Sequence, residues 1–260
     1  MRADVYIYSL GLTKSRQSAQ TLIDNGYVLI DGKAIAKSSQ VIDVSVIHKV
    51  EITDKPRFVS RGGEKLDFAL QTFNIDVANK KCIDIGASTG GFTDCLLQRA
   101  ADSVFAIDSG HSQLDPSLID DNRVTSIEKY NARFLKTEDF PHQFDVAVMD
   151  VSFISQTLLH RGIADILTEN GVLVALIKPQ FECGKSALNS KGVVKKREHH
   201  ALAIHRVIES AMVNGFSCIN ITRSPIVGGT GNVEFLAFFR KEVTPVNNIT
   251  EAKIYAVTKI

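Results

Sequence analysis

The sequence predicts an α/β fold in which a small α+β domain precedes a mostly parallel, seven-stranded, doubly wound sheet. From about residue 63 onward, short apolar runs alternate with helical patterns. Such apolar runs indicate strands that are buried on both faces of a parallel sheet. Before about residue 55, short helical patterns are followed by compact strand and turn signals instead. The two patterns therefore predict two domains of different architecture.

Seven strands are expected in the larger domain, at Lys81–Ile85, Ser103–Asp108, Arg123–Ile127, Phe144–Asp150, Val172–Lys178, Phe216–Arg223 and Val233–Arg240. Helical patterns fall around them, at Glu64–Phe73, Gly90–Ala100, Ser155–Thr168 and Arg197–Asn214. This alternation is the βαβ pattern of a doubly wound sheet. The last two strands are joined by a short, glycine-rich connection, so we expect an antiparallel closing pair.

The predicted domain boundary lies at Asp54-Lys55-Pro56-Arg57. Pro56 has no amide donor and biases the residue before it toward extended conformations, which suits a linker. We therefore expect a small domain over residues 1–54, a linker over 55–62, the sheet domain over 63–243 and a C-terminal tail over 244–260.

Composition excludes several classes of protein. The chain is 44% hydrophobic, which indicates a globular protein with a real core, and its net charge of +1 gives no global reason to expect a nucleic-acid partner. Neither a signal-peptide pattern nor a membrane-spanning run is present, so we expect a cytoplasmic protein with no membrane partner. Buried free thiols and no metal site are expected from the spacing of the cysteines, Cys82, Cys95, Cys183 and Cys218.

Residues 11–26 predict a helix, with Thr13 as its N-cap and Gly26 as its stop, and a strand then enters an Asp31-Gly32 turn. This order resembles the α-L motif, an RNA-binding module of the ribosomal-protein type. The resemblance implies that basic side chains of the module contact RNA phosphates: Lys14, Arg16, Lys33 and Lys37. Charge alone favours a solvated surface, because residues 1–57 hold eight basic and six acidic side chains.

A strand, a glycine loop and a helix start follow one another over residues 81–93, an arrangement that lets backbone amides approach a ligand. Asp108 ends the next strand about twenty residues later, where a carboxylate can accept both ribose hydroxyls of an adenosyl group. A dinucleotide oxidoreductase would need glycine in place of Ser88. An α/β-hydrolase could use Ser88 as its nucleophile, because Gly86 to Gly90 fits GxSxG, but several strands precede the loop in that fold.

Four charged residues stand beside apolar sequence at predicted strand ends or helix starts: Lys65, Asp150, Lys178 and Glu234. Isolated charges at the edge of a core are costly unless paired, so these should converge at a site or form structural ion pairs. Taken with the glycine loop, these blocks resemble the TlyA family of ribosomal RNA methyltransferases, whose catalytic half is similar to FtsJ-type 2′-O-methyltransferases. The resemblance covers nearly the whole chain.

The resemblance implies a Rossmann-like class I methyltransferase that uses S-adenosylmethionine and methylates a ribose 2′-hydroxyl of ribosomal RNA, at a cytidine within a ribosomal subunit. It also implies that Lys65, Asp150, Lys178 and Glu234 are catalytic. The cofactor contacts that it implies are Asp84, Gly86, Ser88, Thr89, Gly90, Phe92, Asp108 and Asp150. Lys178 could serve as the base if Lys65 and a partly dry pocket favour its neutral form, and the in-line methyl transfer needs alignment and no metal.

Two loops are expected on the cofactor side, at residues 109–114 and 131–133. A basic stretch runs from Lys185 to His200, and within it Lys195, Lys196 and Arg197 precede a helix whose dipole disfavours cations there. A phosphate partner would explain them, and a solvated loop is the alternative. We expect the histidines of that helix, including His200, at the surface.

Two other functions remain open from the sequence. One is a non-catalytic RNA-binding or ribosome-assembly factor in which the four charged residues are structural. The other is the membrane-lysing role for which members of the family were named, a hemolysin, although no spanning segment supports it.

Overall fold

The computed structural model describes residues 1–24, 26–35, 37–53 and 57–259. It divides into two compact units, Met1–Arg61 and Gly62–Ile260. The predicted linker begins with Lys55 and Pro56, which lie outside the described residues, as does Asp54.

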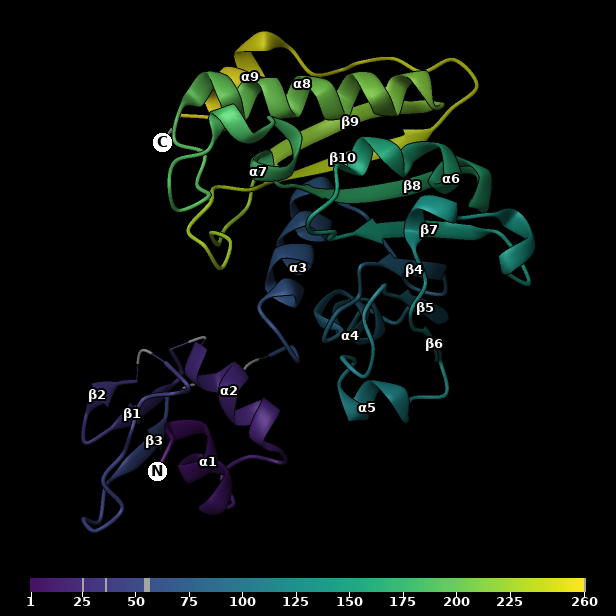
Figure 1. The fold of residues 1–260 in the computed structure, drawn as a ribbon. Helices are drawn as coiled ribbons and strands as arrows, with labels where there is room; N and C mark the ends of the chain where they lie inside the picture. The colour runs from purple at the N-terminus through teal and green to yellow at the C-terminus, as the bar shows by residue number, and fades with distance from the viewer. Residues whose placement is uncertain (25, 36, 54–56, 260) are drawn as a thin grey trace. The chain divides into compact units, whose positions relative to one another are not determined.

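The first unit packs two helices on a three-stranded antiparallel sheet of order β2-β1-β3 (Figure 1). Its elements are α1 Ala3–Ser9, α2 Arg16–Asp24, β1 Val28–Ile30, β2 Lys33–Ala34 and β3 Val50–Ile52. Asp31 and Gly32 join β1 to β2 with φ angles of 52° and 74°. Two positive φ values in a two-residue hairpin are those of a type I′ turn, so the expected Asp-Gly turn is confirmed.

The predicted N-cap of α2 is wrong. The Thr13 hydroxyl donates to the Ser15 carbonyl, whereas the Ser15 hydroxyl accepts a hydrogen bond of 3.1 Å from the Ser18 amide. Ser15 therefore caps the helix, which begins at Arg16. Apolar side chains from both helices and from the sheet form a separate core in this unit: Ala3, Ile7, Ala19, Leu22, Ile23, Val28, Ile30, Ile35 and Ile42.

The second unit contains a seven-stranded sheet of order β6-β5-β4-β7-β8-β10-β9. Its strands are β4 Lys81–Ile85, β5 Ser103–Ile107, β6 Val124–Ile127, β7 Phe144–Met149, β8 Leu167–Ile177, β9 Phe216–Arg223 and β10 Phe235–Lys241. β10 runs antiparallel to both of its neighbours, and the remaining pairs are parallel. The expected antiparallel closing pair is therefore confirmed.

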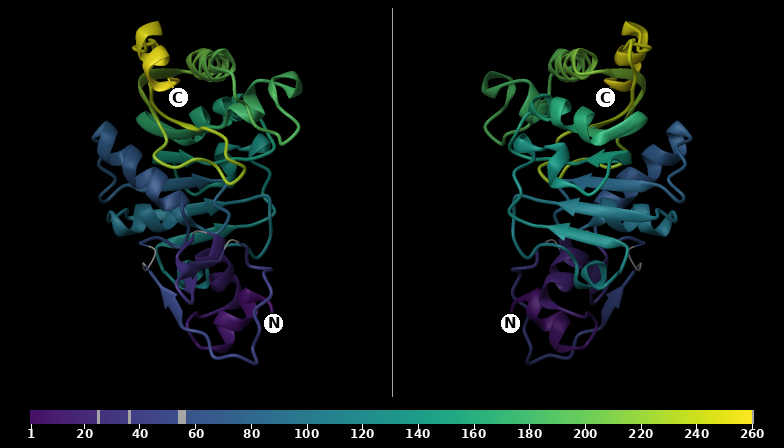
Figure 2. Two further views of the ribbon diagram at one scale, coloured as in Figure 1. Left: turned by 90° about the vertical axis from the view of Figure 1, so that its left-hand side faces the viewer. Right: turned by 90° about the vertical axis from the view of Figure 1, so that its right-hand side faces the viewer.

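Helices cover both faces of this sheet (Figure 2). Phe73 of α3 stacks on Phe238 of β10 on one face, and His200 of α8 contacts Phe235 on the other. The α-helices are α3 Gly62–Phe73, α4 Gly91–Gln98, α5 Pro116–Ile119, α6 His160–Ile166, α7 Pro179–Glu182, α8 Arg197–Val213 and α9 Glu251–Val257. Short 3₁₀ turns are η1 Ala132–Phe134, η2 Thr137–Asp139, η3 Gln156–Leu158 and η4 Lys185–Ala187.

The helix predicted over Ser155–Thr168 is shorter and interrupted. Residues 156–158 form the 3₁₀ turn η3, α6 ends at Ile166, and Leu167 already pairs with Phe144 in the sheet. Asn170 then takes a φ of 61° within a register shift of β8. An apolar run of this length does not distinguish a helix end from a buried strand, which explains the error.

The segment expected as a tail is integrated into the second unit over its described residues. Asn247 forms a bridge with Cys218, and Ile249 and Ile254 are buried in the core of the sheet domain. α9 therefore packs as part of this unit and is not a separate extension.

All four cysteines are buried free thiols, as predicted. Burial raises the pKa of the Cys82 and Cys218 thiols to about 12, so both remain protonated and unreactive at neutral pH. Among the described residues, the helices are all too short or too polar to cross a membrane.

Candidate active site

A cavity of about 560 Å³ opens at the carboxyl edge of the sheet. Loops that follow four neighbouring strands line it, among them Gly86 and Ser88 after β4, Asp108 after β5, Tyr130 after β6 and Asp150 after β7. Doubly wound sheets bind ligands at this edge, and the volume is typical of a small-molecule site. Both loops expected on the cofactor side, 109–114 and 131–133, contribute to the lining.

Gly86 begins the loop after β4 with a φ of 85°. A Cβ atom at this position would stand 2.7 Å from the carbonyl oxygen of Asp150, so the position requires glycine. The Asp150 amide in turn donates to the Ile85 carbonyl, at 3.0 Å. The two strand ends thus approach each other closely at the floor of the cavity.

The Asp108 carboxylate joins the loops after β4 and β5. One oxygen accepts from the Ser88 amide at 2.9 Å, and the other accepts from the Gly110 amide at 2.6 Å. A carboxylate oxygen can accept a second hydrogen bond, so Asp108 still has capacity for ligand hydroxyls in the cavity that it lines.

Asp84 is the next-to-last residue of β4 and is fully buried. One of its oxygens accepts from the amide and hydroxyl of Thr93, at 2.9 and 2.7 Å, and the other has no hydrogen-bond partner among the described residues. Burial raises the pKa of the carboxyl to about 7, although the Thr93 hydrogen bonds oppose the rise. A buried carboxylate oxygen without a donor fits a cationic ligand group nearby.

The predicted cofactor residues fall into two groups. Gly86, Ser88, Asp108 and Asp150 line the cavity, whereas Asp84, Thr89, Gly90 and Phe92 are not part of its lining. Gly90 has a packing role, because a Cβ atom there would stand 2.2 Å from the Leu118 side chain. Phe92 is 3% exposed and packs in the core.

Sequence reasoning missed Ser152 and Phe153 in the loop after β7, and both line the cavity. Phe153 has a φ of 64° and is 93% exposed, which is unusual for an aromatic residue. Their position directly after a predicted strand end was the available signal, since ligands gather at that edge.

Two of the four predicted catalytic residues form an ion pair across β7 and β8. The Lys178 amine lies 2.6 Å from Asp150 Oδ1 and donates to the Ser152 hydroxyl at 2.7 Å. Since Asp150 and Ser152 both line the cavity, the amine is held directly beside it.

The other two residues form a second, buried ion pair. The Lys65 amine of α3 donates to Glu234 Oε2 at 2.6 Å, with side chains that are only 11% and 3% exposed. Glu234 precedes β10, and the pairing of Phe235 with Ile177 places it opposite Lys178 in strand register. The structure thus gathers the predicted tetrad at one sheet edge, as two ion pairs.

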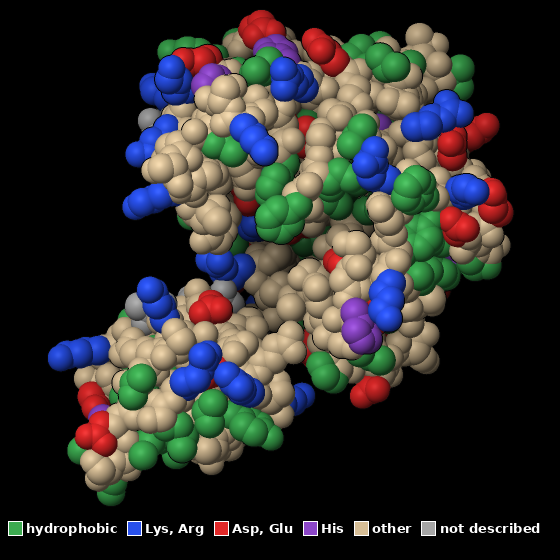
Figure 3. Space-filling model, in the orientation of Figure 1, with side chains coloured by type: hydrophobic (Ala, Val, Ile, Leu, Met, Phe, Trp, Pro, Cys, Tyr) green, Lys and Arg blue, Asp and Glu red, His purple; other side chains and the backbone are tan. Residues whose placement is uncertain are grey.

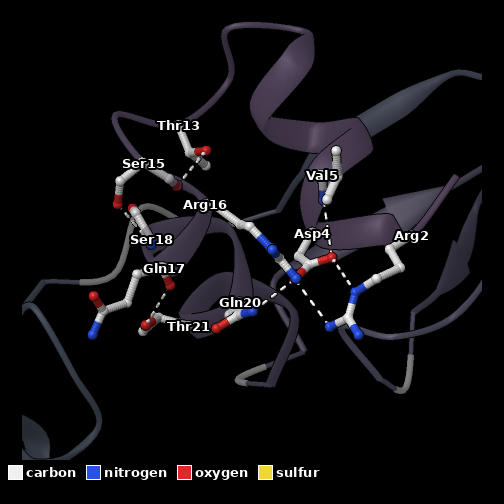
Figure 4. A network of polar contacts seen from close by, with 10 residues as sticks. All are labelled: Arg2, Asp4, Val5, Thr13, Ser15, Arg16, Gln17, Ser18, Gln20 and Thr21. Carbon is white, nitrogen blue, oxygen red and sulfur yellow. Dashed lines mark hydrogen bonds and ion pairs between the residues drawn. The ribbon is translucent and has the colours of Figure 1, made fainter.

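Basic residues in the first unit differ in their surroundings. Asp4 is fully buried and accepts hydrogen bonds from Arg2, Arg16 and Gln20 (Figure 4). The hydrogen bond from Arg2 and those from Gln20 and Arg16 hold the pKa of this carboxyl well below its usual range. Arg16 therefore fixes α2 to α1, although its side chain is still 51% exposed. The other predicted RNA contacts are exposed too, and no ion pair holds them among the described residues: Lys14, Lys33 and Lys37.

In the basic loop, Lys195 and Lys196 are exposed, but Arg197 is not free. Its guanidinium lies 3.2 Å from the centre of the Tyr255 ring and donates to the Thr258 hydroxyl and the Tyr255 carbonyl. Arg197 therefore anchors α9. Lys and Arg side chains gather on the side of the second unit where α7 and the start of α8 lie (Figure 3).

The expectation that His200 lies at the surface is wrong. It is fully buried, its Nε2 is 3.1 Å from the Val194 carbonyl, and burial lowers its pKa. Its position three and four residues before the buried Ala203 and Ile204 places it on the same helical face, a signal that the sequence carried.

Comparison with known proteins agrees with this geometry. Residues 58–241 match the FtsJ-like methyltransferase model, and residues 1–47 match the S4 domain model. The chain belongs to the FtsJ-like methyltransferase family. With its S4 domain, it groups with relatives that carry the TlyA and hemolysin A names.

Among the relatives of this methyltransferase, hemolysin A of Brachyspira hyodysenteriae is 42% identical over 92% of this chain and 99% of its own. The 16S/23S rRNA (cytidine-2′-O)-methyltransferase TlyA of Mycobacterium tuberculosis is 39% identical over 93% of this chain and 90% of its own. A solved structure named as a hemolysin from Streptococcus thermophilus is 41% identical, with a TM-score of 0.80, and covers 99% of this chain and 94% of its own. The expected family and Rossmann-like fold are confirmed.

Proposed function

We propose that the protein transfers a methyl group from S-adenosylmethionine to a ribose 2′-hydroxyl of ribosomal RNA, at a cytidine within a ribosomal subunit. The Lys178–Asp150 ion pair supports this function most directly, because it lies beside the cavity of a methyltransferase domain. The name of the Mycobacterium tuberculosis relative supports the choice of a cytidine and of the ribose 2′-oxygen.

The cavity residues fit the cofactor. Asp108 would accept the ribose hydroxyls, and Gly86 gives close backbone access. Asp84 does not line the cavity, but its buried carboxylate would balance the charge of the methionine ammonium from beneath the loop. When bound, S-adenosylmethionine supplies an electrophilic methyl group on a sulfonium. Three further cofactor residues were expected from the sequence: Thr89, Gly90 and Phe92. They do not line the cavity and would instead support the loop and the start of α4.

Lys178 would take the proton of the 2′-hydroxyl as general base. Asp150 and Ser152 hold its amine at 2.6 and 2.7 Å, which fixes the position from which it can reach a hydroxyl beside the cavity. The Lys65–Glu234 pair would support the adjoining strand end and keep the buried Glu234 charge compensated.

The S4 domain supports an RNA substrate. We propose that the N-terminal module, residues 1–54, delivers the substrate and that residues 63–243 carry out the reaction. Exposed Lys14, Lys33 and Lys37, together with Lys195 and Lys196, would contact phosphates. A ribosomal substrate would place the enzyme in the cytoplasm.

Replacing Lys178 by Ala tests this function. We expect methyl transfer from labelled S-adenosylmethionine to unmodified ribosomal subunits to fall by about 10²–10⁴-fold, the usual contribution of a general base. Cofactor affinity, measured by calorimetry, should change by less than about threefold, since Lys178 does not line the cavity. Lys253→Ala, on the exposed face of α9, is the matched control.

Retained methylation by Lys178→Ala would reject Lys178 as the base. If the wild-type protein binds no S-adenosylmethionine but binds subunits, the non-catalytic assembly factor is the better description. Mapping of ribose methylation in ribosomal RNA from cells with and without the gene identifies the modified nucleotide.

A further inference from the structure

Glu182 is a buried carboxylate for which the proposed reaction has no role. It ends α7 and is 6% exposed. Its two oxygens accept hydrogen bonds from the Ser155 hydroxyl at 2.5 Å and from the Gln156 amide at 3.0 Å. Burial raises the pKa of this carboxyl, while the two hydrogen bonds oppose the rise. Burying a carboxylate costs more free energy than burying an apolar side chain, so the presence of Glu182 at this position needs an explanation.

The hydrogen bonds of Glu182 join two segments that the sheet no longer holds together. The pairing of β7 with β8 ends at Met149 and Ala175. Beyond that point, the chain after β7 carries Asp150, and the chain after β8 carries Lys178. Glu182 lies four residues after Lys178 and bonds to the residues that follow the loop containing Asp150.

Neighbouring contacts fix both ends of this connection. Arg206 of α8 donates to the Glu182 carbonyl at 2.7 Å, which holds the end of α7 on the long helix. The Gln156 side chain donates to the Leu176 carbonyl at 3.3 Å, which ties the loop after β7 back to β8. Both segments that Glu182 joins are therefore held in place, so its hydrogen bonds can fix the position of one segment relative to the other.

The loop between Asp150 and Ser155 needs such support. It forms the wall of the cavity over residues 150–154, and Phe153 within it has a φ of 64°. A non-glycine residue keeps such a conformation only where its surroundings impose it. The Glu182 hydrogen bonds fix the end of this loop and can therefore help to impose the Phe153 conformation.

We propose that Glu182 is a positioning residue that sets the geometry of the Asp150–Lys178 pair and of the adjoining cavity wall by bonding the segment after β8 to the segment after β7. This inference rests on the proposed function. It adds a residue that controls turnover without touching the reacting atoms.

Steady-state kinetics on the full-length protein test this inference, with S-adenosylmethionine and unmodified ribosomal subunits as substrates. Glu182→Gln keeps the volume but replaces one acceptor oxygen by an NH2 donor, which then faces either the Ser155 hydroxyl or the Gln156 amide, so we expect kcat to fall by about tenfold or more. KM for subunits should change by less than about threefold.

Ser155 provides a second, milder pair of variants. Ser155→Ala removes one donor and should lower kcat by about threefold or more, and Ser155→Thr, which restores the hydroxyl, should recover it. Glu209→Gln, on the exposed face of α8, is the control for loss of a carboxylate and should leave kcat unchanged. Thermal unfolding of each variant checks that the fold is intact.

Wild-type kcat in folded Glu182→Gln or in Ser155→Ala would overturn the inference, as would failure of Ser155→Thr to recover activity lost in Ser155→Ala. If Glu182→Gln does not fold, the two Ser155 variants decide. Wild-type activity tests the proposed function, and the ratio of variant to wild type tests Glu182, so the two failures are distinguishable.

Discussion

At the scale of single residues, Asp84 combines full burial with an incomplete set of hydrogen bonds. Its pKa is about 7 in the folded chain, mainly because burial disfavours the ionised form. In the unfolded chain the pKa is about 3.9, so folding binds a proton that the unfolded chain releases. Below about pH 4 the carboxyl is protonated in both states, so the stability of the folded chain is fully retained. As pH rises toward about 7, ionisation favours the unfolded chain, and the free energy of unfolding falls.

Asp84→Asn should therefore stabilise the cofactor-free protein at neutral pH. The gain should grow between about pH 4 and pH 7 and then level off, at up to roughly 4 kcal/mol, and denaturant unfolding at about pH 5 and about pH 8 measures it. Cofactor affinity should fall by about tenfold or more if the carboxylate pairs with an ammonium. Exposed Asp102→Asn is the control. Unchanged cofactor affinity would leave Asp84 with only its structural contact to Thr93.

At the scale of elements, a buried amide side chain helps to hold the basic loop before α8. Asn232 is 1% exposed, accepts from the Val194 amide at 2.9 Å and donates to the Gly192 carbonyl at 3.1 Å. It stands two residues before Glu234, so the loop and the buried ion pair share an anchor. The loop is therefore ordered near Val194, while the Lys195 and Lys196 side chains remain exposed.

The three basic residues at the start of α8 should consequently behave differently. Lys195→Glu with Lys196→Glu should weaken binding to ribosomal subunits and reduce the salt slope by about 0.7–0.9 for each phosphate that the protein no longer neutralises. Arg197→Glu should chiefly lower the thermal unfolding temperature, because it loses the stacking on Tyr255 and the bonds to α9. Equal effects of all three on RNA affinity alone would contradict this division.

At the scale of the whole molecule, the pattern of apolar residues predicted the strands, because that pattern is local. Continuous apolar runs located the seven strands to within a few residues, except at the start of β8, and the short 224–232 connection predicted the antiparallel pair. The strand-end positions of Asp150, Lys178 and Glu234 placed them at one edge. Pairing between distant residues was not predictable, because nothing local specifies that Glu182 meets Ser155 or that Arg197 stacks on Tyr255.

The proposed division between RNA delivery by the first unit and methyl transfer by the second gives a kinetic prediction. Lys14, Lys33 and Lys37 are exposed on the first unit, so their combined replacement by Glu should weaken substrate capture and raise KM for subunits by about tenfold or more. Because these residues lie in a module outside the methyltransferase core, kcat at saturation should stay within about twofold. Arg16→Ala is the informative contrast, since it deprives the buried Asp4 of a partner and should destabilise the module itself. A matched fall in kcat for the triple lysine variant would mean that the module contributes to the transition state as well as to delivery.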